Sequence, residues 1–152
     1  MRILFVATIG ETHRGFLKGQ IQFLQERGFE VHLAASPGLA LSECGEWPGV
    51  QVWGVPMSRK TLAIKDISAF FRLAVLFHKI NPDILHLSTP KAAFLGSVAS
   101  VFLRNTRKIF FVRGCITGAQ RGWSKNANRY AETLTAKLCD EAIAVSHSLD
   151  RK

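Results

Sequence analysis

Short apolar runs alternate with longer segments of helical period along most of this chain. Several runs are nearly continuous in Val, Ile, Leu, Phe and Ala, as expected where both faces of a parallel sheet are covered. They have strand length and predict six strands, at residues 3–8, 30–35, 50–55, 83–87, 108–112 and 141–145.

Four segments between these runs have apolar residues at helical spacing. Residues 66–80 begin with an acid, which favours a helix N-terminus, and end just before an Asn-Pro pair. The stripe expected to face the core in this helix comprises Ile67, Phe70 or Phe71, Ala74 and Phe77. Residues 91–104 are apolar on nearly every side and should lie deep between neighbouring elements. The other predicted helices are residues 16–27, which end at Gly28, and residues 124–139.

This alternation of strands and helices predicts a Rossmann-like, doubly wound parallel sheet in three α/β/α layers. The length of 152 residues suits one such domain and is too short for two. The three cysteines form no CxxC pair, so neither a zinc site nor a disulfide framework is indicated, and a reducing compartment is expected. The opening apolar run is too short for a secretory signal, and no later run approaches the ~20 residues that cross a bilayer.

The formal charge of +9 is concentrated in the second half of the chain. No acidic residue occurs between Asp83 and Glu132, whereas basic residues occur throughout that stretch, namely Lys91, Arg104, Arg107, Lys108, Arg113, Arg121, Lys125 and Arg129. The positive electrostatic field of such a segment attracts phosphates on nucleotides, lipid carriers, anionic membranes or nucleic acid. The alternative is a solvated basic surface without a specific ligand. Nucleic acid is disfavoured because aromatic residues are not interleaved with the basic ones.

In open parallel sheets, ligands bind beyond the carboxyl ends of the strands, near the point where the strand order reverses. Residues 8–15 follow the first strand and include Gly10, which would let the backbone approach a ligand. The segment has neither GxGxxG nor a P-loop pattern. The second strand ends in Ala-Ala-Ser, without the acid that would bind the ribose of a dinucleotide, which argues against an NAD enzyme.

The turn after the fourth strand has the richest chemistry. Pro90 suits the first turn of a helix, with Thr89 or Ser88 as its cap. Lys91 then adds positive charge where the helix dipole is already positive, at a cost of ~0.3–1 kcal/mol, for which a bound anion is the expected compensation. His86, at the predicted strand tip, is a general base, a hydrogen-bond donor to a sugar, or a histidine with a structural role only.

The fifth strand ends at Arg113, which is followed by a glycine. Its guanidinium could hold a phosphate or carboxylate with two hydrogen bonds. The alternative is an ion pair with a nearby acid, although acids are scarce in this part of the sequence.

Taken in order along the chain, these segments resemble the amino-terminal domains of GT-B glycosyltransferases of family 4, and especially the bacterial branch that builds lipid-linked polysaccharides. The most specific stretch is HLSTPKA at residues 86–92, similar to that branch's HxxTPKA. The other matching stretches are the opening strand with its Gly-bearing turn, residues 24–31, residues 55–59 with Asp66, residues 81–86, Glu132 and residues 142–146. Where the family often has His-Gly after the fifth strand, this chain has Arg113-Gly114, so a histidine-specific role is not carried over there.

The resemblance implies that residues 1–152 form the acceptor-side domain of an enzyme with two Rossmann-like domains facing across a cleft. The nucleotide-sugar domain would be absent from this chain, which alone is expected to be inactive. The implied catalytic candidate is His86, and the implied acceptor- and phosphate-binding residues are Gly10, His13, Arg59, Lys91 and Arg113.

The resemblance also implies the partners and the location of the protein. The donor would be a nucleotide-sugar and the acceptor a glycan or a lipid-linked glycan. Helix N-termini and basic side chains would neutralise the leaving phosphates, so no cofactor and no obligate metal is expected. The enzyme would be cytoplasmic, or peripheral on the inner face of the cell membrane, where an anionic lipid surface attracts its positive charge. Two alternatives stay open: a nucleotide-sugar epimerase or reductase, and a non-catalytic basic module that binds anionic membrane or nucleic acid.

Overall fold

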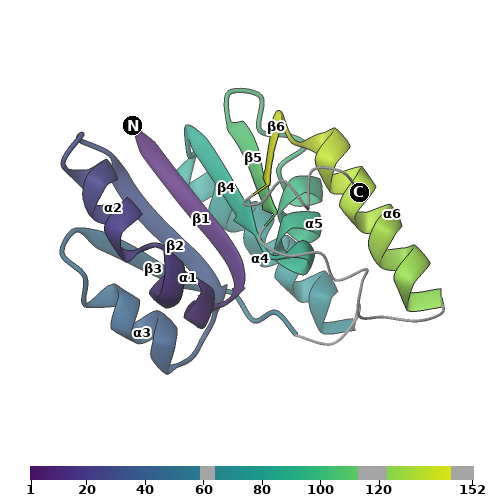
Figure 1. Cartoon of the computed structure of the whole chain (residues 1–152), viewed down its shortest axis with the longest axis horizontal. Helices are drawn as coiled ribbons and strands as arrows, with labels where there is room; N and C mark the ends of the chain where they lie inside the picture. The colour runs from purple at the N-terminus through teal and green to yellow at the C-terminus, as the bar shows by residue number, and fades with distance from the viewer. Residues whose placement is uncertain (59–63, 113–122, 145–152) are drawn as a thin grey trace.

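The computed structural model describes residues 1–58, 64–112 and 123–144, with only the backbone path for residues 64, 65 and 123–129. In this part of the chain, six strands form one parallel sheet in the order β3-β2-β1-β4-β5-β6 (Figure 1). The strands are β1 (Arg2–Ile9), β2 (Glu30–Ser36), β3 (Val50–Gly54), β4 (Ile84–Ser88), β5 (Arg107–Val112) and β6 (Glu141–Ala144). The Rossmann-like fold class predicted from the sequence is confirmed.

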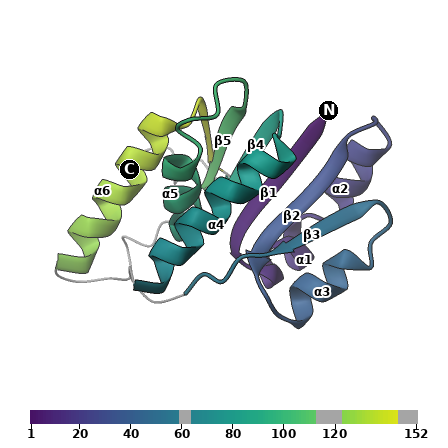
Figure 2. The same cartoon turned by 180° about the vertical axis from the view of Figure 1, so that it is seen from behind.

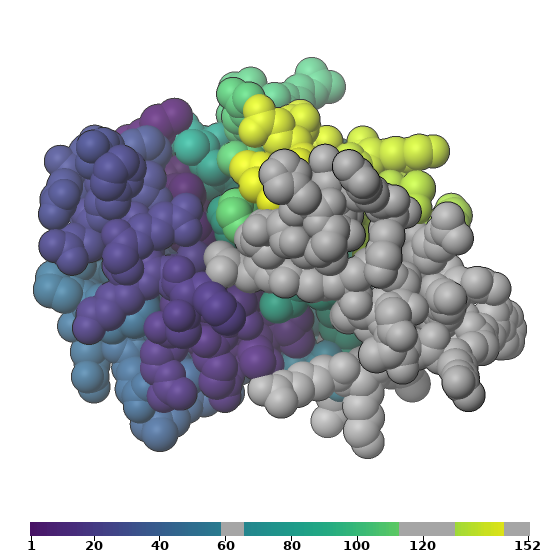
Figure 3. Space-filling view, in the orientation of Figure 1, coloured from purple at the N-terminus to yellow at the C-terminus, as the bar shows by residue number. Residues whose placement is uncertain are grey.

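Helices cover both faces of the sheet. They are α1 (Gly10–Phe16), α2 (Lys18–Gln25), α3 (Leu39–Gly45), α4 (Ile64–Ile80), α5 (Pro90–Ala99) and α6 (Trp123–Leu138). The first three lie in front of β1, β2 and β3 in Figure 1, and the purple and blue atoms of this part form the left side of the same view in Figure 3. Seen from behind, α4 and α5 cover the opposite face, with α6 beside α5 (Figure 2).

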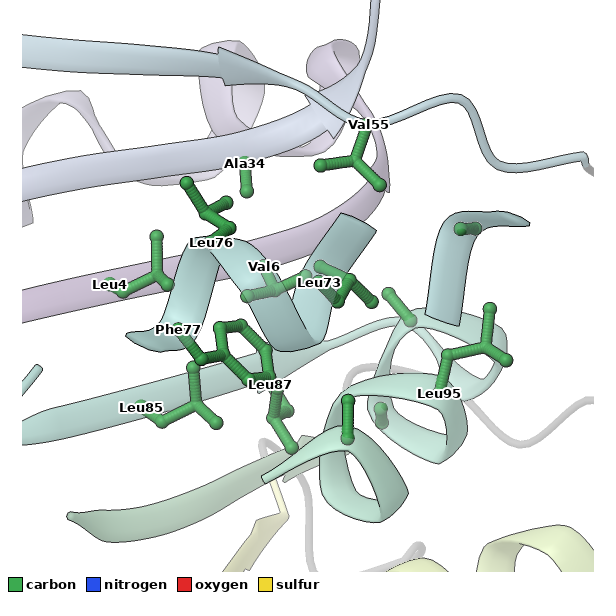
Figure 4. Close-up of a cluster of buried hydrophobic side chains, with 14 of the residues drawn as sticks. Leu4, Val6, Ala34, Val55, Leu73, Leu76, Phe77, Leu85, Leu87 and Leu95 are labelled. Carbon is green, nitrogen blue, oxygen red and sulfur yellow. The ribbon is translucent and has the colours of Figure 1, made fainter. Parts of the chain in front are cut away.

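The alternation of side chains along β1 divides the core between the two faces. Leu4 and Val6 join the cluster formed with α4 and α5, in which Leu73 and Phe77 of α4 are fully buried (Figure 4). The alternate residues Ile3 and Phe5 pack on the other face with Leu17, Ile21 and Leu41. Each fully buried side chain of this size stabilises the fold by about 1.5–3 kcal/mol, so the two half-cores fix the helices against the sheet.

The strand order reverses between β1 and β4. Both strands are parallel neighbours, with Phe5 of β1 in register with His86 of β4. The chain moves outward from β1 to β2 and β3, then returns to add β4, β5 and β6 on the other side. The carboxyl ends of β1 and β4 therefore flank the crevice where ligands bind in this class of sheet.

The predicted strands are confirmed to within one residue at each described end, but the helix predictions need four corrections. The stripe predicted to face the core in α4 is wrong at Ile67, which is 60% exposed. Residues 16–27 are not one helix. Helix α1 begins at Gly10, directly after β1, and the fully buried Leu17 separates it from α2. The short helix α3 was not predicted at all. The helix predicted at residues 91–104 ends at Ala99, where the Ser100 hydroxyl donates to the carbonyl of Ser97 and a turn follows.

Candidate functional site

Two threonine side chains join the carboxyl ends of β1 and β4. The backbone N–H of Thr8 donates to Oγ1 of Thr89 at 3.1 Å, and the two hydroxyl oxygens lie 2.8 Å apart. These contacts link the end of β1, just before α1, with the residue that precedes α5. The elements on either side of the crevice are thus held in a fixed relation to each other.

Thr89 has an unusual backbone conformation for a residue with a side chain, with φ 68° and ψ 134°. Such a conformation costs on the order of 1–3 kcal/mol and persists only where neighbouring contacts hold it. The prediction that Pro90 opens α5 is confirmed. The prediction of a hydroxyl cap is wrong for Thr89, since it occupies the N-cap position without a side-chain bond to the helix. Its hydroxyl contacts Thr8 instead.

Lys91 forms an ion pair with Asp66 at the start of α4. Its Nζ lies 2.9 Å from Oδ2 of Asp66, and the two side chains are only 15% and 3% exposed. A helix that follows a strand of a parallel sheet begins at the carboxyl edge, and α4 and α5 pack against each other on the same face, which brings their first turns together. We expected a bound anion to compensate the positive charge of Lys91 at the helix N-terminus. The carboxylate of Asp66 supplies this compensation instead.

Gly10 is the first residue of α1 and is buried. A Cβ at this position would lie 2.5 Å from the backbone nitrogen of Leu41 and 2.9 Å from its Cα. The sequence predicted that the backbone at Gly10 approaches a ligand closely. In the structure, this backbone closely approaches Leu41 of α3. Gly10 and Lys91 nevertheless lie on the same edge of the sheet, because each follows one of the two bonded threonines by two residues.

The two predicted histidines have buried rings. His13 is fully buried, and its Nε2–H donates to the carbonyl of Ala34 in β2 at 3.0 Å. His86 lies inside β4 and not at its tip, because the strand continues to Ser88. Its ring, in a residue 4% exposed, packs between Phe5 at 4.7 Å and Phe111 at 5.0 Å.

These surroundings bear on the roles predicted for the two histidines. The contacts of His13 join α1 to β2, and Nδ1 of His86 lies 3.2 Å from the Ser88 hydroxyl. For His86, the ring contacts and the Ser88 contact match the alternative of a histidine with a structural role only. Ligand binding by His13 and catalysis by His86 stay predictions.

The remaining predicted residues, Arg59 and Arg113, lie outside the residues that the structure describes. Two contacts of this site were not predicted from the sequence, that of Thr8 with Thr89 and that of Asp66 with Lys91. The rule that successive helices start at one edge of a parallel sheet could have identified the second pair. Within residues 1–58, 64–112 and 123–144, no three metal-binding side chains gather and no helix is long and apolar enough to span a bilayer.

Similar proteins of known sequence point to one family. The sequence model of Glycosyltransferase Family 4 matches residues 17–152. A curated relative, the capsular polysaccharide biosynthesis glycosyltransferase CapM of Staphylococcus aureus, is 28% identical over 136 residues, which are 90% of this chain and 35% of the relative. The chain thus spans about a third of the length of that relative.

Solved structures agree with the fold. A UDP-N-acetylglucosamine 2-epimerase matches 99% of this chain and 43% of its own, with a TM-score of 0.72 and 18% identity. A glycosyltransferase from Rickettsia africae matches 99% of this chain and 38% of its own (TM-score 0.68, 17% identity), and MurG of Acinetobacter baumannii matches 94% and 40% (TM-score 0.67, 14% identity). At these identities the likeness shows the Rossmann-like architecture alone. Since the family match covers nearly nine-tenths of the sequence, the chain belongs to glycosyltransferase family 4.

Proposed function

We propose that this chain is the acceptor-side, amino-terminal domain of a glycosyltransferase that acts in bacterial polysaccharide synthesis. The enzyme moves a sugar from a nucleotide-sugar to a glycan or lipid-linked acceptor. The observation that carries the proposal is the family match over residues 17–152, and the relative named for capsular polysaccharide synthesis supports the choice of pathway.

The chemistry of the step defines what the site must supply. The acceptor hydroxyl oxygen bonds to the anomeric carbon of the sugar while the bond from that carbon to the phosphate oxygen breaks. The hydroxyl proton passes to a base or to solvent, and the leaving nucleotide takes the electron pair as phosphate charge. Donors fixed in advance around that charge lower the barrier.

Lys91 is the described side chain best placed for this task. It lies at the start of α5, on the edge of the sheet where the strand order reverses, and helix N-termini favour anions. Asp66 holds the ammonium in place through the 2.9 Å contact. In this proposal a phosphate of the donor or acceptor shares the ammonium with Asp66, and Arg113 adds a second cation. No metal ion and no organic cofactor takes part.

The proposed location follows from the acceptor. A lipid-linked acceptor lies in the membrane, and the chain carries a formal charge of +9 that anionic lipids attract. We therefore propose that the enzyme is cytoplasmic and binds peripherally to the inner face of the cell membrane, without nucleic acid as a partner.

The test is a transfer assay with the full-length protein. Nucleotide-sugars labelled in the sugar are incubated with the protein and a lipid extract from bacteria that make the polysaccharide, and the label is followed into the lipid or glycan fraction. Lys91→Ala and Arg113→Ala should each lower the rate roughly 100-fold, the usual effect of removing one group that stabilises developing charge. Lys137→Ala, an exposed lysine of α6, is the matched control and should leave the rate unchanged.

Loss of folding must be separated from loss of chemistry, because Lys91→Ala leaves the buried Asp66 without its lysine. The double variant Asp66→Asn/Lys91→Ala removes both charges and should stay folded but slow. Normal transfer by folded Lys91 and Arg113 variants would refute the phosphate role. Conversion of a nucleotide-sugar to its epimer, without transfer, would favour the epimerase alternative over this proposal.

A further inference from the structure

A hollow of about 490 Å³ lies between helix α2 and the segment that joins α3 to β3. Its apolar part is made by the buried Ile21 of α2, the half-buried Trp47 and the exposed Pro48. A volume of this size is typical of small-molecule sites. Figure 1 shows both walls, α2 and the connection from α3 to β3, on the left side of the molecule.

Polar side chains line the rest of this hollow. Lys18, Gln22 and Glu26 are exposed and follow one another at intervals of four residues along α2 and its C-cap, so they share one face of the helix. The Gln22 side-chain amide donates to the Glu26 carboxylate at 3.3 Å. These groups offer both donors and acceptors along one wall. The charges of Lys18 and Glu26 are opposite, so the lining side chains carry no net charge.

The side chain of Gln25 holds the two walls together. Its Nε2–H donates to the Pro48 carbonyl at 2.6 Å. The segment is also closed on itself, because the Trp47 N–H donates to the Cys44 carbonyl and the Val50 N–H donates to the Trp47 carbonyl, both at 3.2 Å. Trp47 packs in addition against the core on this face of the sheet. The hollow is therefore preorganised, and a ligand does not have to order the segment first.

We infer that this α2–Trp47 hollow binds a segment of glycan through neutral sugar rings. A sugar ring has C–H faces, which pack on apolar and aromatic side chains, and a rim of hydroxyls, which donate and accept hydrogen bonds. Trp47 and Pro48 supply surface for the face of the ring, and Gln22 and Glu26 supply partners for its hydroxyls. A phosphate-bearing ligand fits less well, because Glu26 repels it and only Lys18 attracts it.

The hollow is remote from the crevice between β1 and β4. Helix α2 ends and β3 begins at the amino edge of the sheet, whereas the crevice is at the carboxyl edge, and β2 separates β3 from β1. A long glycan can be anchored here by its earlier sugars while its growing end reaches the crevice, which raises the local concentration of that end. The inference rests on the proposed function for this purpose, but glycan binding can be tested without sugar transfer.

The test uses Trp47 itself as the reporter. Full-length protein labelled with fluorotryptophan gives a fluorine resonance for each tryptophan, and the resonance missing from Trp47→Phe belongs to Trp47. Oligosaccharides cut by mild acid from the surface polysaccharide of the bacteria used in the transfer assay should shift this resonance, and the shift should saturate. In Gln22→Ala/Glu26→Ala the half-saturating concentration should rise about tenfold, because two hydrogen-bonding groups are lost.

Gln20→Ala is the matched control, since Gln20 is an exposed glutamine of the same helix that does not line the hollow. It should leave the titration unchanged. Gln22 and Glu26 are exposed as well, and unchanged melting temperatures should confirm that the variants are folded. In the transfer assay, the double variant should raise KM for long acceptors by about the same factor as it weakens binding, with kcat unchanged.

A Trp47 resonance that does not move with the oligosaccharides would overturn the inference, as would equal titrations of the double variant and the parent protein. A larger shift with inorganic phosphate than with the oligosaccharides would also overturn it. Saturable glycan binding at Trp47 in a protein that transfers no sugar would refute the proposed function and leave the glycan site standing. Normal transfer without any shift at Trp47 would refute the glycan site alone.

Discussion

Lys91 Nζ and Asp66 Oδ2 lie 2.9 Å apart and join the first turns of α5 and α4. A lysine at a helix N-terminus is unfavourable alone, because the helix dipole is positive there. Asp66 offsets that charge and is itself at the favourable end of α4. The two helices are thereby tied at the carboxyl edge of the sheet, so any ligand that uses Lys91 acts on an existing ion pair.

Removing one charge of this pair should be costlier than removing both. Lys91→Met leaves a carboxylate that is 3% exposed and should lower the free energy of unfolding by about 3–5 kcal/mol. Asp66→Asn should cost less, about 1–3 kcal/mol, because the long lysine side chain can turn toward solvent. Chemical denaturation of both variants and of the double variant Asp66→Asn/Lys91→Met measures the coupling. Additive losses in the double variant would show that the pair does not contribute to stability as a unit.

The hydroxyl contact between Thr8 and Thr89 should hold the strained backbone of Thr89 in place. Thr89→Val keeps a branched side chain at φ 68° and loses the 2.8 Å contact, so it should lower the free energy of unfolding by about 1–3 kcal/mol. Thr89→Gly loses the same contact but adopts that φ without strain, and should be nearer to the parent protein. Thermal unfolding of the two variants gives the comparison, and a less stable glycine variant would show that the backbone there is not strained.

The fold could be predicted from the sequence because its signals are local. Apolar runs of strand length marked the strands, several of them nearly continuous, and the buried α5 was recognisable from an apolar pattern on nearly every side. Gly28, predicted as a helix stop, has φ +79° just beyond α2. The prediction failed where a short helix has too few buried residues to give a clear helical period. The seven residues of α3 bury only Ala40, Leu41 and Cys44, which is too few for a helical stripe to stand out.

The candidate site was predicted less completely because its contacts are distant in the sequence. Asp66 and Lys91 are 25 residues apart, and Thr8 and Thr89 are 81 apart. The residue types around the fourth strand indicated phosphate chemistry, but no pattern in the chain shows which side chains already have partners. The same limitation applies to His86, whose catalytic role stays a prediction: the sequence did not show that its ring packs between two phenylalanine rings.

The contact between α1 and α3 predicts that Gly10 cannot carry a side chain. In Gly10→Ala the new Cβ would overlap backbone atoms of Leu41, which can move only if the helices separate, so unfolding should become easier by about 2–3 kcal/mol. Gly15→Ala lies in the same helix with open space around it and should be neutral or stabilising by up to about 1 kcal/mol. Denaturant midpoints of the two variants test this, and equal effects would disprove the role given to the helix contact.

His32 should make stability depend on pH. The residue is 3% exposed, and its Nδ1 accepts a hydrogen bond from the Trp53 Nε1–H at 3.3 Å. Burial lowers the pKa of His32 below its usual 6.5, and the Glu30 carboxylate, 3.1 Å from Nε2, opposes this only in part. The unfolded chain therefore binds a proton more readily than the folded protein. The stability due to neutral His32 is complete above about pH 6.5 and is lost as the pH falls toward the folded pKa.

The variant His32→Asn isolates this effect from the titration of other groups. Asparagine keeps an acceptor near Trp53 but does not titrate, so the variant should be the less stable protein near neutral pH because it fills the buried space poorly. Its disadvantage should shrink between about pH 7.5 and about pH 5.5, since only the parent protein loses the histidine contribution over that interval. Urea denaturation of both proteins across this range measures the difference. Parallel stability curves would mean that His32 has the same pKa in the folded and unfolded states, and that burial among Trp53 and Glu30 does not penalise its charged form.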